Sequence, residues 1–381
     1  MKKLFDFIFV TLLLVYPFIN MIPNDITIFG KLWAALATIF VFTFILLKLH
    51  DINRYIISGF IIFLFAFISI LLSNELNFLK ILSAYKYALP LLLASYIYWY
   101  PLDEKRLNTI YKITFFYIIL MLILATYRLS LINFNLLLVT LYKDFVWYEK
   151  SHNFAQMYIL LSIGFLYLSY LLKKNLYLAY MFFIPIFFIG VRSVIMGAIL
   201  FLAVLSIPII KRNFLKFILL LAISISSLIV IQPNFSKLTP LFLSAQDATR
   251  GTDKANLTSL SSGRDIILNY YIEHLDSERI FIGSGLQYLE KNATFIFGLH
   301  NDTLEFFFSF GLFGLFSFLF AIYYNIFYNA YKNTKEFDRY FIVGIIMLFL
   351  SISSFAFFLY NQIIVYLFIL VYIIKNNKIR Y

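Results

Sequence analysis

The chain has 381 residues, of which 62% are hydrophobic, 21% aromatic and only 13% charged. A soluble domain carries about 25% charged residues, so this chain has too little charge to cover a water-facing surface. The net charge of +12 does not indicate nucleic-acid binding, because most Lys and Arg residues form short clusters between apolar runs rather than a continuous basic face. The composition therefore predicts an all-α polytopic membrane protein.

Apolar runs recur from one end of the chain to the other, and many approach the roughly 20 residues that cross a bilayer core. The runs are continuous rather than alternating with period two, which excludes a β-barrel. A further apolar stretch at 130–141 is closely bounded by polar residues and is interpreted as a re-entrant or interfacial segment. We predict about twelve membrane-spanning helices, near residues 5–22, 29–48, 54–73, 78–99, 107–127, 152–172, 175–190, 192–210, 213–231, 303–328, 338–356 and 358–375.

Positive charges predict the orientation, because Lys and Arg are enriched in the cytoplasmic loops of membrane proteins. If the N-terminus is cytoplasmic, the C-terminus is too, and the chain divides into nine spans (1–231), a large outward loop (232–302) and three further spans (303–381). With this orientation the positive clusters fall inside: Lys2/Lys3, Lys48/Arg54, Lys105/Arg106, Lys173/Lys174, Lys211/Arg212/Lys216, Lys332/Lys335/Arg339 and Lys375/Lys378/Arg380.

The outward loop is the one long hydrophilic connection in the sequence. Its first part, from Gln232 to Ser262, is rich in Ser, Thr, Asn, Asp and Pro and is typical of irregular structure. From Arg264 to Leu275 the apolar positions follow helical spacing, which predicts an amphipathic helix. Gly283 and Gly285 then break the chain before the next span.

A metal site is not expected. Cysteine is absent, which excludes thiolate ligands, and the four histidines (His50, His152, His274 and His300) show no H-E-x-x-H pattern. No cofactor is predicted either.

Two arginines are candidates for binding an anion. Arg192 lies between two apolar runs, and its planar fork of donors suits phosphate oxygens. Alternatively, Arg192 only marks a helix boundary and extends its side chain to the membrane surface. Arg264 opens the predicted loop helix, where a cation opposes the helix dipole unless an anion lies nearby. An ion pair with Asp265 is the competing explanation.

His300 is the candidate base, because a neutral imidazole removes hydroxyl protons near neutral pH. It lies where the loop meets a Phe-rich span, with Asp302 and Glu305 close enough in sequence to orient it. The alternative is an interfacial histidine without a catalytic role. An ionisable group within a span costs roughly 2.5–3.5 kcal/mol on insertion, so its presence needs an explanation. Lys86, within the fourth span, either faces a lipid phosphate or extends its side chain outwards.

Several short motifs occur together in a fixed order: Gly190-Val-Arg192-Ser, Ser262-Gly-Arg264, Gly283-Ser-Gly285, Leu299-His300-Asn301, Glu305, and Gly311-Leu-Phe-Gly314. This pattern resembles the O-antigen ligase and polymerase family of bacterial polysaccharide assembly, most clearly from about residue 150 to 330.

The resemblance implies a metal-independent glycosyltransferase with a C-type (GT-C-like) membrane fold. Such an enzyme acts on undecaprenyl-pyrophosphate-linked glycans at the periplasmic face of the inner membrane. Carried over residue by residue, Arg192 and Arg264 hold the pyrophosphate of the donor and His300 activates the acceptor hydroxyl. We assign Lys86, Asn301 and Glu305 as further candidate substrate-binding residues.

Two activities of the family remain open at this point. A polymerase joins lipid-linked repeat units, whereas a ligase transfers the finished chain to the lipid A core. The compact chain and its aromatic residues near the loop favour the polymerase, with a chain-length regulator as a candidate partner. A lipid-linked oligosaccharide flippase is a third hypothesis, although such transporters usually show related halves and no internal repeat is visible here.

Overall fold

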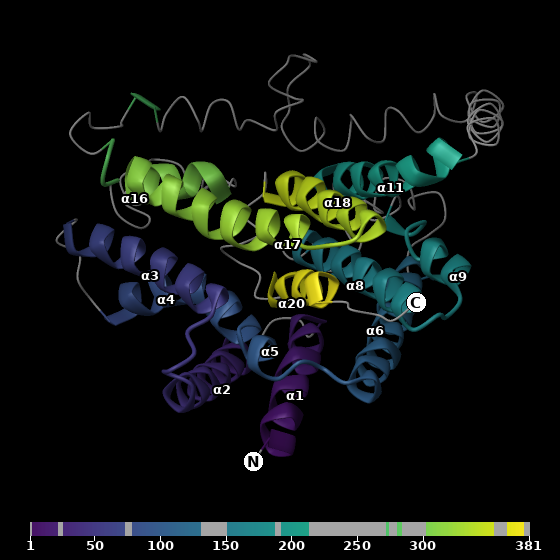
Figure 1. Cartoon of the computed structure of the whole chain (residues 1–381), viewed down its shortest axis with the longest axis horizontal. Helices are drawn as coiled ribbons and strands as arrows, with labels where there is room; N and C mark the ends of the chain where they lie inside the picture. The colour runs from purple at the N-terminus through teal and green to yellow at the C-terminus, as the bar shows by residue number, and fades with distance from the viewer. Residues whose placement is uncertain are drawn as a thin grey trace.

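The computed structural model describes residues 2–21, 26–72, 78–130, 151–186, 192–212, 272–273, 280–283, 302–353 and 364–376. Every regular element in these ranges is helical, which confirms an all-α membrane protein (Figure 1). The helices are α1 (Lys2–Met21), α2 (Ile26–Leu47), α3 (Arg54–Leu72), α4 (Phe78–Ala94), α5 (Tyr96–Trp99), α6 (Glu104–Ser130), α8 (Ser151–Leu171), α9 (Leu176–Met181), α11 (Arg192–Arg212), α16 (Asp302–Phe318), the π-helix η3 (Leu319–Tyr328), α17 (Asn329–Lys332), α18 (Glu336–Ser353) and α20 (Ile364–Asn376).

Five stretches of the described helices are long and apolar enough to cross a membrane, and each coincides with a predicted span. The predicted span at 213–231, the 130–141 segment apart from its first residue, and nearly all of the loop 232–302 lie outside the described residues. Within the predicted loop helix, only Ile272 and Glu273 are described, and both are helical. The five stretches are Gly30–Leu47, Arg54–Leu71, Glu104–Ile123, Phe154–Leu171 and Phe306–Lys332.

The predicted span at 175–190 is not one regular helix over its described part. After the short α9, the chain continues as tighter turns. These turns carry Phe182 and Phe183 into the protein, where they are 6% and 2% exposed. The Phe182 ring lies 5.3 Å from that of Phe165 on α8, and the Phe183 ring lies 5.8 Å from that of Phe201 on α11. Aromatic packing against two neighbours thus accounts for the departure from regular helix.

Helix α8 lies at the centre of the molecule, and 94% of its apolar stretch is buried. It contacts α6, α9, α20, α1 and α11. A helix that is apolar on all sides, with buried positions all round, is typical of the core of a membrane bundle.

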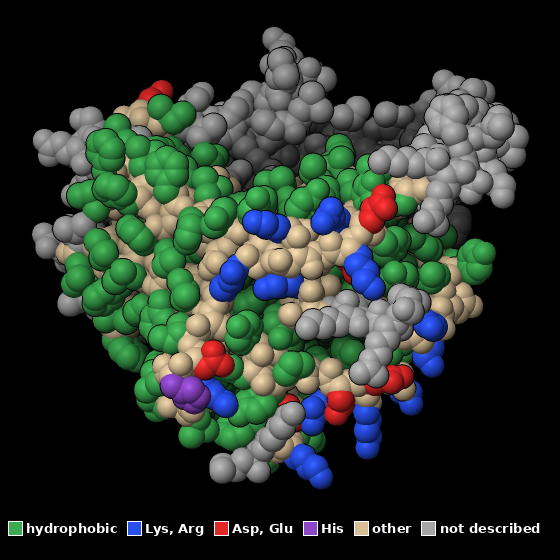
Figure 2. Space-filling view, in the orientation of Figure 1, with side chains coloured by type: hydrophobic (Ala, Val, Ile, Leu, Met, Phe, Trp, Pro, Cys, Tyr) green, Lys and Arg blue, Asp and Glu red, His purple; other side chains and the backbone are tan. Residues whose placement is uncertain are grey.

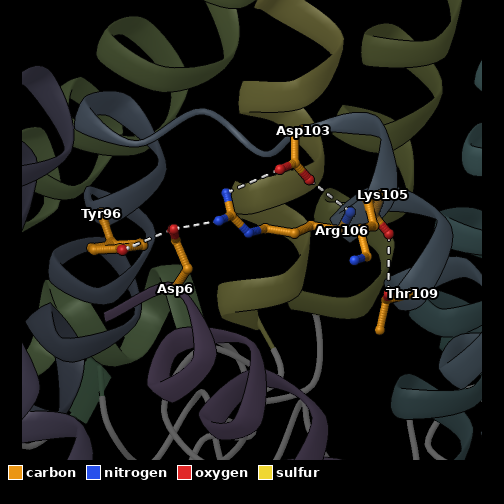
Figure 3. A network of polar contacts seen from close by, with 6 residues as sticks. All are labelled: Asp6, Tyr96, Asp103, Lys105, Arg106 and Thr109. Carbon is orange, nitrogen blue, oxygen red and sulfur yellow. Dashed lines mark hydrogen bonds and ion pairs between the residues drawn. The ribbon is translucent and has the colours of Figure 1, made fainter. Parts of the chain in front are cut away.

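Polar contacts join α1 to the start of α6 (Figure 3). The Asp6 carboxylate, 2% exposed, lies 2.6 Å from the Arg106 guanidinium. Tyr96 donates its hydroxyl to the other Asp6 oxygen at 2.9 Å, and Asp103 lies 3.5 Å from Arg106. The buried charge of Asp6 is therefore both paired and hydrogen-bonded.

Other contacts join connections that the sequence places on the cytoplasmic side. The Trp99 indole donates to the Asp51 carbonyl at 2.9 Å, and the Asn325 amide donates to the Arg54 carbonyl at 3.2 Å. Lys48 lies over the Tyr100 ring. Figure 2 shows Lys and Arg side chains gathered across one face of the molecule and apolar side chains covering its flank.

Candidate functional site

Arg192 is the first residue of α11, and α11 packs along α18. The Ser351 hydroxyl of α18 donates to the Ser193 carbonyl at 2.6 Å. A Cβ on Gly197 would lie 2.6 Å from the Leu348 side chain, so this glycine lets the two helices approach closely. Contacts within two turns of Arg192 therefore fix the start of α11 on α18.

Helix α16 is interrupted at Gly311, whose φ of 67° and ψ of −167° are non-helical. The Phe306 and Phe318 rings stack with centroids 4.4 Å apart. In a straight helix these two residues would be separated by about 18 Å along the axis, so the chain must fold back at Gly311. We name residues 302–310 the returning arm and residues 312–332 the crossing arm (Figure 1).

The predicted span at 303–328 is therefore not a single continuous membrane-crossing helix. The hydropathy of this stretch is continuous, but Gly311 adopts a backbone conformation that is essentially restricted to glycine. The crossing arm spans the bundle and the returning arm packs back against it. Gly314 makes this packing possible, because a Cβ there would overlap the Cβ of Phe310.

Helices α3 and α4 hold the returning arm. The Ser69 hydroxyl of α3 donates to the Ser309 carbonyl at 2.6 Å. The Tyr87 ring of α4 lies 5.4 Å from Phe306 and 5.9 Å from Phe310, edge to face in both cases. The arm is therefore anchored by one buried hydrogen bond and an aromatic cluster.

Two hydrogen bonds along α3 show near which end of this helix the bend at Gly311 lies. Ser58 donates to the Ala321 carbonyl at 3.0 Å, whereas Ser69 donates to the Ser309 carbonyl at 2.6 Å. The two serines are about 16 Å apart along the helix axis. The bend at Gly311 thus lies toward the Leu72 end of α3, which the sequence places outside, and the crossing arm runs inward from it.

A segment of the large loop docks on this bend. The amides of Leu312 and Phe313 donate to the carbonyls of Ile280 and Phe281, at 2.8 and 3.2 Å. Gly283, whose φ is 81°, lies against the backbone of the returning arm. The docked segment, residues 280–283, therefore supplies the acceptors that the first amides of the crossing arm need.

The predicted site residues fall partly within these elements. His300, Arg264 and Asn301 lie outside the described residues. Glu305 is on the returning arm, three residues after α16 begins at Asp302. Lys86 is exposed on α4, next to the buried Tyr87 that packs on the returning arm.

The described contacts place the candidate residues on two helix groups. Arg192 begins α11, which packs on α18, while Glu305 and Lys86 lie on elements that pack together beside α3. No cluster of three metal-ligating side chains occurs within the described ranges.

Two features of the site region were not predicted from the sequence. Gly283 and Gly311 were noted only as parts of motifs, and their contact required the fold. Gln156 on α8 is 1% exposed, and its amide has no hydrogen-bond partner among the described residues. A single Gln in an apolar run does not show from the sequence whether its side-chain amide will be buried.

The fold and the broken helix define a helical membrane protein with residues 280–283 docked on its bundle. Residues 176–319 match the family described as O-Antigen ligase. This part of the chain is similar to that family, which supports the resemblance found in the sequence. The match runs from α9 through the loop to the first residue of η3. Comparison with curated proteins finds no match.

The similarity supports a glycosyltransferase-like enzyme that acts on a lipid-linked glycan in a membrane setting. The matched region contains Arg192, Arg264 and His300, together with Gly283 and Gly311.

Proposed function

We propose that the chain polymerises undecaprenyl-pyrophosphate-linked oligosaccharide repeat units at the periplasmic face of the bacterial inner membrane. The family match over 176–319 carries the proposal, because it covers every candidate catalytic residue. A transferase family also favours glycan transfer over the flippase hypothesis. The product is an O-antigen or capsule polysaccharide.

The proposed architecture has about twelve spans in a C-type glycosyltransferase fold, with both termini cytoplasmic. Residues 1–231 and 303–381 form the membrane part, and residues 232–302 form the periplasmic loop. Contacts of two connections that are predicted to be cytoplasmic support this orientation, because Trp99 donates to the Asp51 carbonyl and Asn325 to the Arg54 carbonyl.

Arg192 and Arg264 hold the donor pyrophosphate. Because α11 begins at Arg192, this residue lies at the positive end of the helix dipole. Two guanidinium groups also stabilise the charge that develops on the leaving pyrophosphate, a role that a divalent cation fills in other transferases. The proposed reaction is therefore metal-independent.

His300 acts as the base. It takes the proton of the acceptor hydroxyl while that oxygen bonds to C1 of the donor sugar and the bond from C1 to the pyrophosphate oxygen breaks. The lipid pyrophosphate leaves, and the anomeric carbon inverts. Asn301, Glu305 and Lys86 bind the substrates around this centre. The returning arm supports this assignment, since Asp302, which follows His300 and Asn301, is fixed to the bundle through that arm.

A ligase is the second candidate, because the matching family is described by that activity. The donor chemistry is the same, and the acceptor is then the lipid A core rather than another repeat unit. A polymerase would in addition work with a chain-length regulator protein.

The test is a gel of surface polysaccharide and lipid-linked intermediates. Cells lacking the protein are compared with cells complemented by wild type, His300→Ala or His274→Ala, the last being a matched loop histidine without a proposed role. We expect acceptors with a single repeat unit in the deletion strain and in His300→Ala, and a full ladder with His274→Ala.

Accumulation of full-length polymer on the lipid carrier would identify a ligase instead. An unchanged ladder in the deletion strain would contradict both activities. A normal ladder with His300→Ala would contradict the proposed base.

A further inference from the structure

Gln156 is a buried polar side chain on the central helix α8. The residue is 1% exposed, and neither its amide nitrogen Nε2 nor its oxygen Oε1 has a hydrogen-bond partner among the residues that the structure describes. Buried amides are nearly always hydrogen-bonded, because losing water without gaining a partner is costly. An exception of this kind needs an explanation, and a bound substrate group is one.

A second buried polar residue on α8 shows the usual solution. The Ser162 side chain is fully buried, and its hydroxyl donates to the Tyr158 carbonyl one turn earlier in the helix at 2.9 Å. Ser and Thr hydroxyls satisfy themselves on their own helix in this way. The Gln156 amide makes no such bond within the described chain, so its helix does not account for its presence.

Gln156 lies on the face of α8 that is directed toward α18. At about 100° per residue, Tyr167 falls on the same face as Gln156. The Tyr167 ring lies 4.9 Å from the Phe341 ring of α18. Phe165 lies on the opposite face of α8, where it stacks on Tyr111 of α6 at 4.6 Å. Gln156 therefore faces away from α6 and toward the pair formed by α18 and α11.

Along the membrane normal, Gln156 lies near the first turn of α11. Figure 1 shows α8 and α18 with similarly inclined axes, and the predicted alternation of the spans gives them opposite chain directions. The contact between Tyr167 and Phe341 provides a common level for the two helices. Outward from this level, Gln156 lies about 16 Å along α8 and Ser351 about 15 Å along α18. Ser351 bonds to Ser193 of α11, and α11 contacts α8, so Gln156 is at the depth of this bond.

The two amide atoms define the chemistry of the group that would bind. Nε2 donates and Oε1 accepts, so a complete set of hydrogen bonds needs a group that both accepts and donates. A sugar hydroxyl or acetamido group does both. An ionised pyrophosphate offers only acceptors and would leave Oε1 unpaired. Gln156 therefore suits the sugar of a lipid-linked glycan better than its phosphates.

We propose that Gln156 binds a hydroxyl or acetamido group of the sugar next to the donor pyrophosphate. The inference rests on the proposed function, which assigns that pyrophosphate to Arg192 in the first turn of α11. Packed helices lie about 8–10 Å apart, so a sugar bonded to the pyrophosphate extends from α11 to α8. Gln156 is a substrate-binding residue that contributes to the choice of sugar and transfers no proton.

Gln156→Met replaces the amide with an apolar side chain of similar length. The variant should unfold at the same temperature as wild type or higher, because it removes an unpaired buried amide. Polysaccharide synthesis should nevertheless fall by about tenfold or more at unchanged protein level, because the sugar loses both hydrogen bonds. Ser162→Ala is the matched control, since its buried hydroxyl bonds within α8, and it should retain the full ladder.

A second measurement separates the sugar from the pyrophosphate. Thermal unfolding of the detergent-purified chain is followed with lipid-linked glycan extracted from the deletion strain, and separately with undecaprenyl pyrophosphate that carries no sugar. We expect both probes to stabilise wild type. In Gln156→Met, the midpoint concentration should rise by about tenfold for the lipid-linked glycan and stay unchanged for undecaprenyl pyrophosphate.

An unchanged response of Gln156→Met to lipid-linked glycan, or a full ladder in cells, would overturn the role of Gln156. Equal weakening of both probes would assign the amide to the pyrophosphate and overturn the sugar assignment. A markedly lower unfolding temperature of Gln156→Met without either probe would show that the amide is structural and would also overturn the inference. The proposed function fails separately, if the deletion strain keeps its polysaccharide or if wild type responds to neither probe.

Discussion

At the residue scale, the pair formed by Asp6 and Arg106 shows how a charge is accommodated at the edge of an apolar bundle. Asp6 is 2% exposed, and its carboxylate pairs with the Arg106 guanidinium and accepts a hydrogen bond from the Tyr96 hydroxyl. Removing one member of a buried pair leaves the other charge without compensation, which costs more than the pair itself contributes.

Arg106→Met should therefore destabilise the protein by about 3–5 kcal/mol, because the Asp6 carboxylate stays buried without its cation. The measurement is thermal unfolding of the detergent-purified protein, and the matched control is Lys105→Met at the adjacent exposed position. The double variant Asp6→Leu with Arg106→Met should recover much of the loss, since no buried charge remains. An Arg106→Met protein as stable as the control would contradict this account.

A second prediction at this scale concerns the donor pyrophosphate. Arg192→Lys keeps the positive charge but loses the planar fork of donors, whereas Arg192→Gln loses both. We expect polysaccharide synthesis to fall in the order wild type, Lys, Gln, with unchanged amounts of protein in the membrane. The gel of lipid-linked intermediates measures it, and equal activity of the three proteins would remove Arg192 from the site.

At the element scale, a glycine determines how three helices meet. Gly164 on α8 leaves room for the Tyr366 ring of α20, which would overlap a Cβ at that position. The Tyr366 hydroxyl lies 3.0 Å from that of Thr114 on α6. One tyrosine thus crosses α8 to join the helices on either side of it.

Gly164→Ala should destabilise the bundle by about 1–3 kcal/mol, because the Tyr366 ring must move. In the Tyr366→Ala background the same change should have little effect, so the two substitutions will not be additive. Thermal unfolding of the two single variants and the double variant measures the coupling. Simple additivity would show that Gly164 is not constrained by this ring.

At the scale of the whole molecule, the predicted alternation of the spans assigns each connection to one side of the membrane. Lys174 is exposed and belongs to a predicted cytoplasmic connection, and Phe281 is 55% exposed on the docked loop segment. The natural chain has no cysteine, so a single introduced thiol reports one position.

In intact cells, a thiol reagent that enters the periplasm but does not cross the inner membrane should modify Phe281→Cys and leave Lys174→Cys unmodified. Permeabilised membranes should allow both to react. Modification of Lys174→Cys in intact cells would show that the chain has the opposite orientation.

The sequence by itself determined the membrane class, most helix positions and the resemblance to a family, because hydropathy and short motifs act locally along the chain. It placed α2, α3, α6 and α8 close to their observed bounds. It could not show that the span at 303–328 folds back, since Gly311 lies in an uninterrupted apolar run and its backbone conformation depends on a partner segment.

Only the tertiary structure decided that Gly283 and Gly311 form one contact and that Ser351 holds the start of α11. These relations join segments far apart in the sequence, and no local pattern encodes which small residue will meet which backbone. The physical reason is that close packing and completed hydrogen bonds arise between helices, whereas hydropathy, charge and motif spacing are read along a single chain.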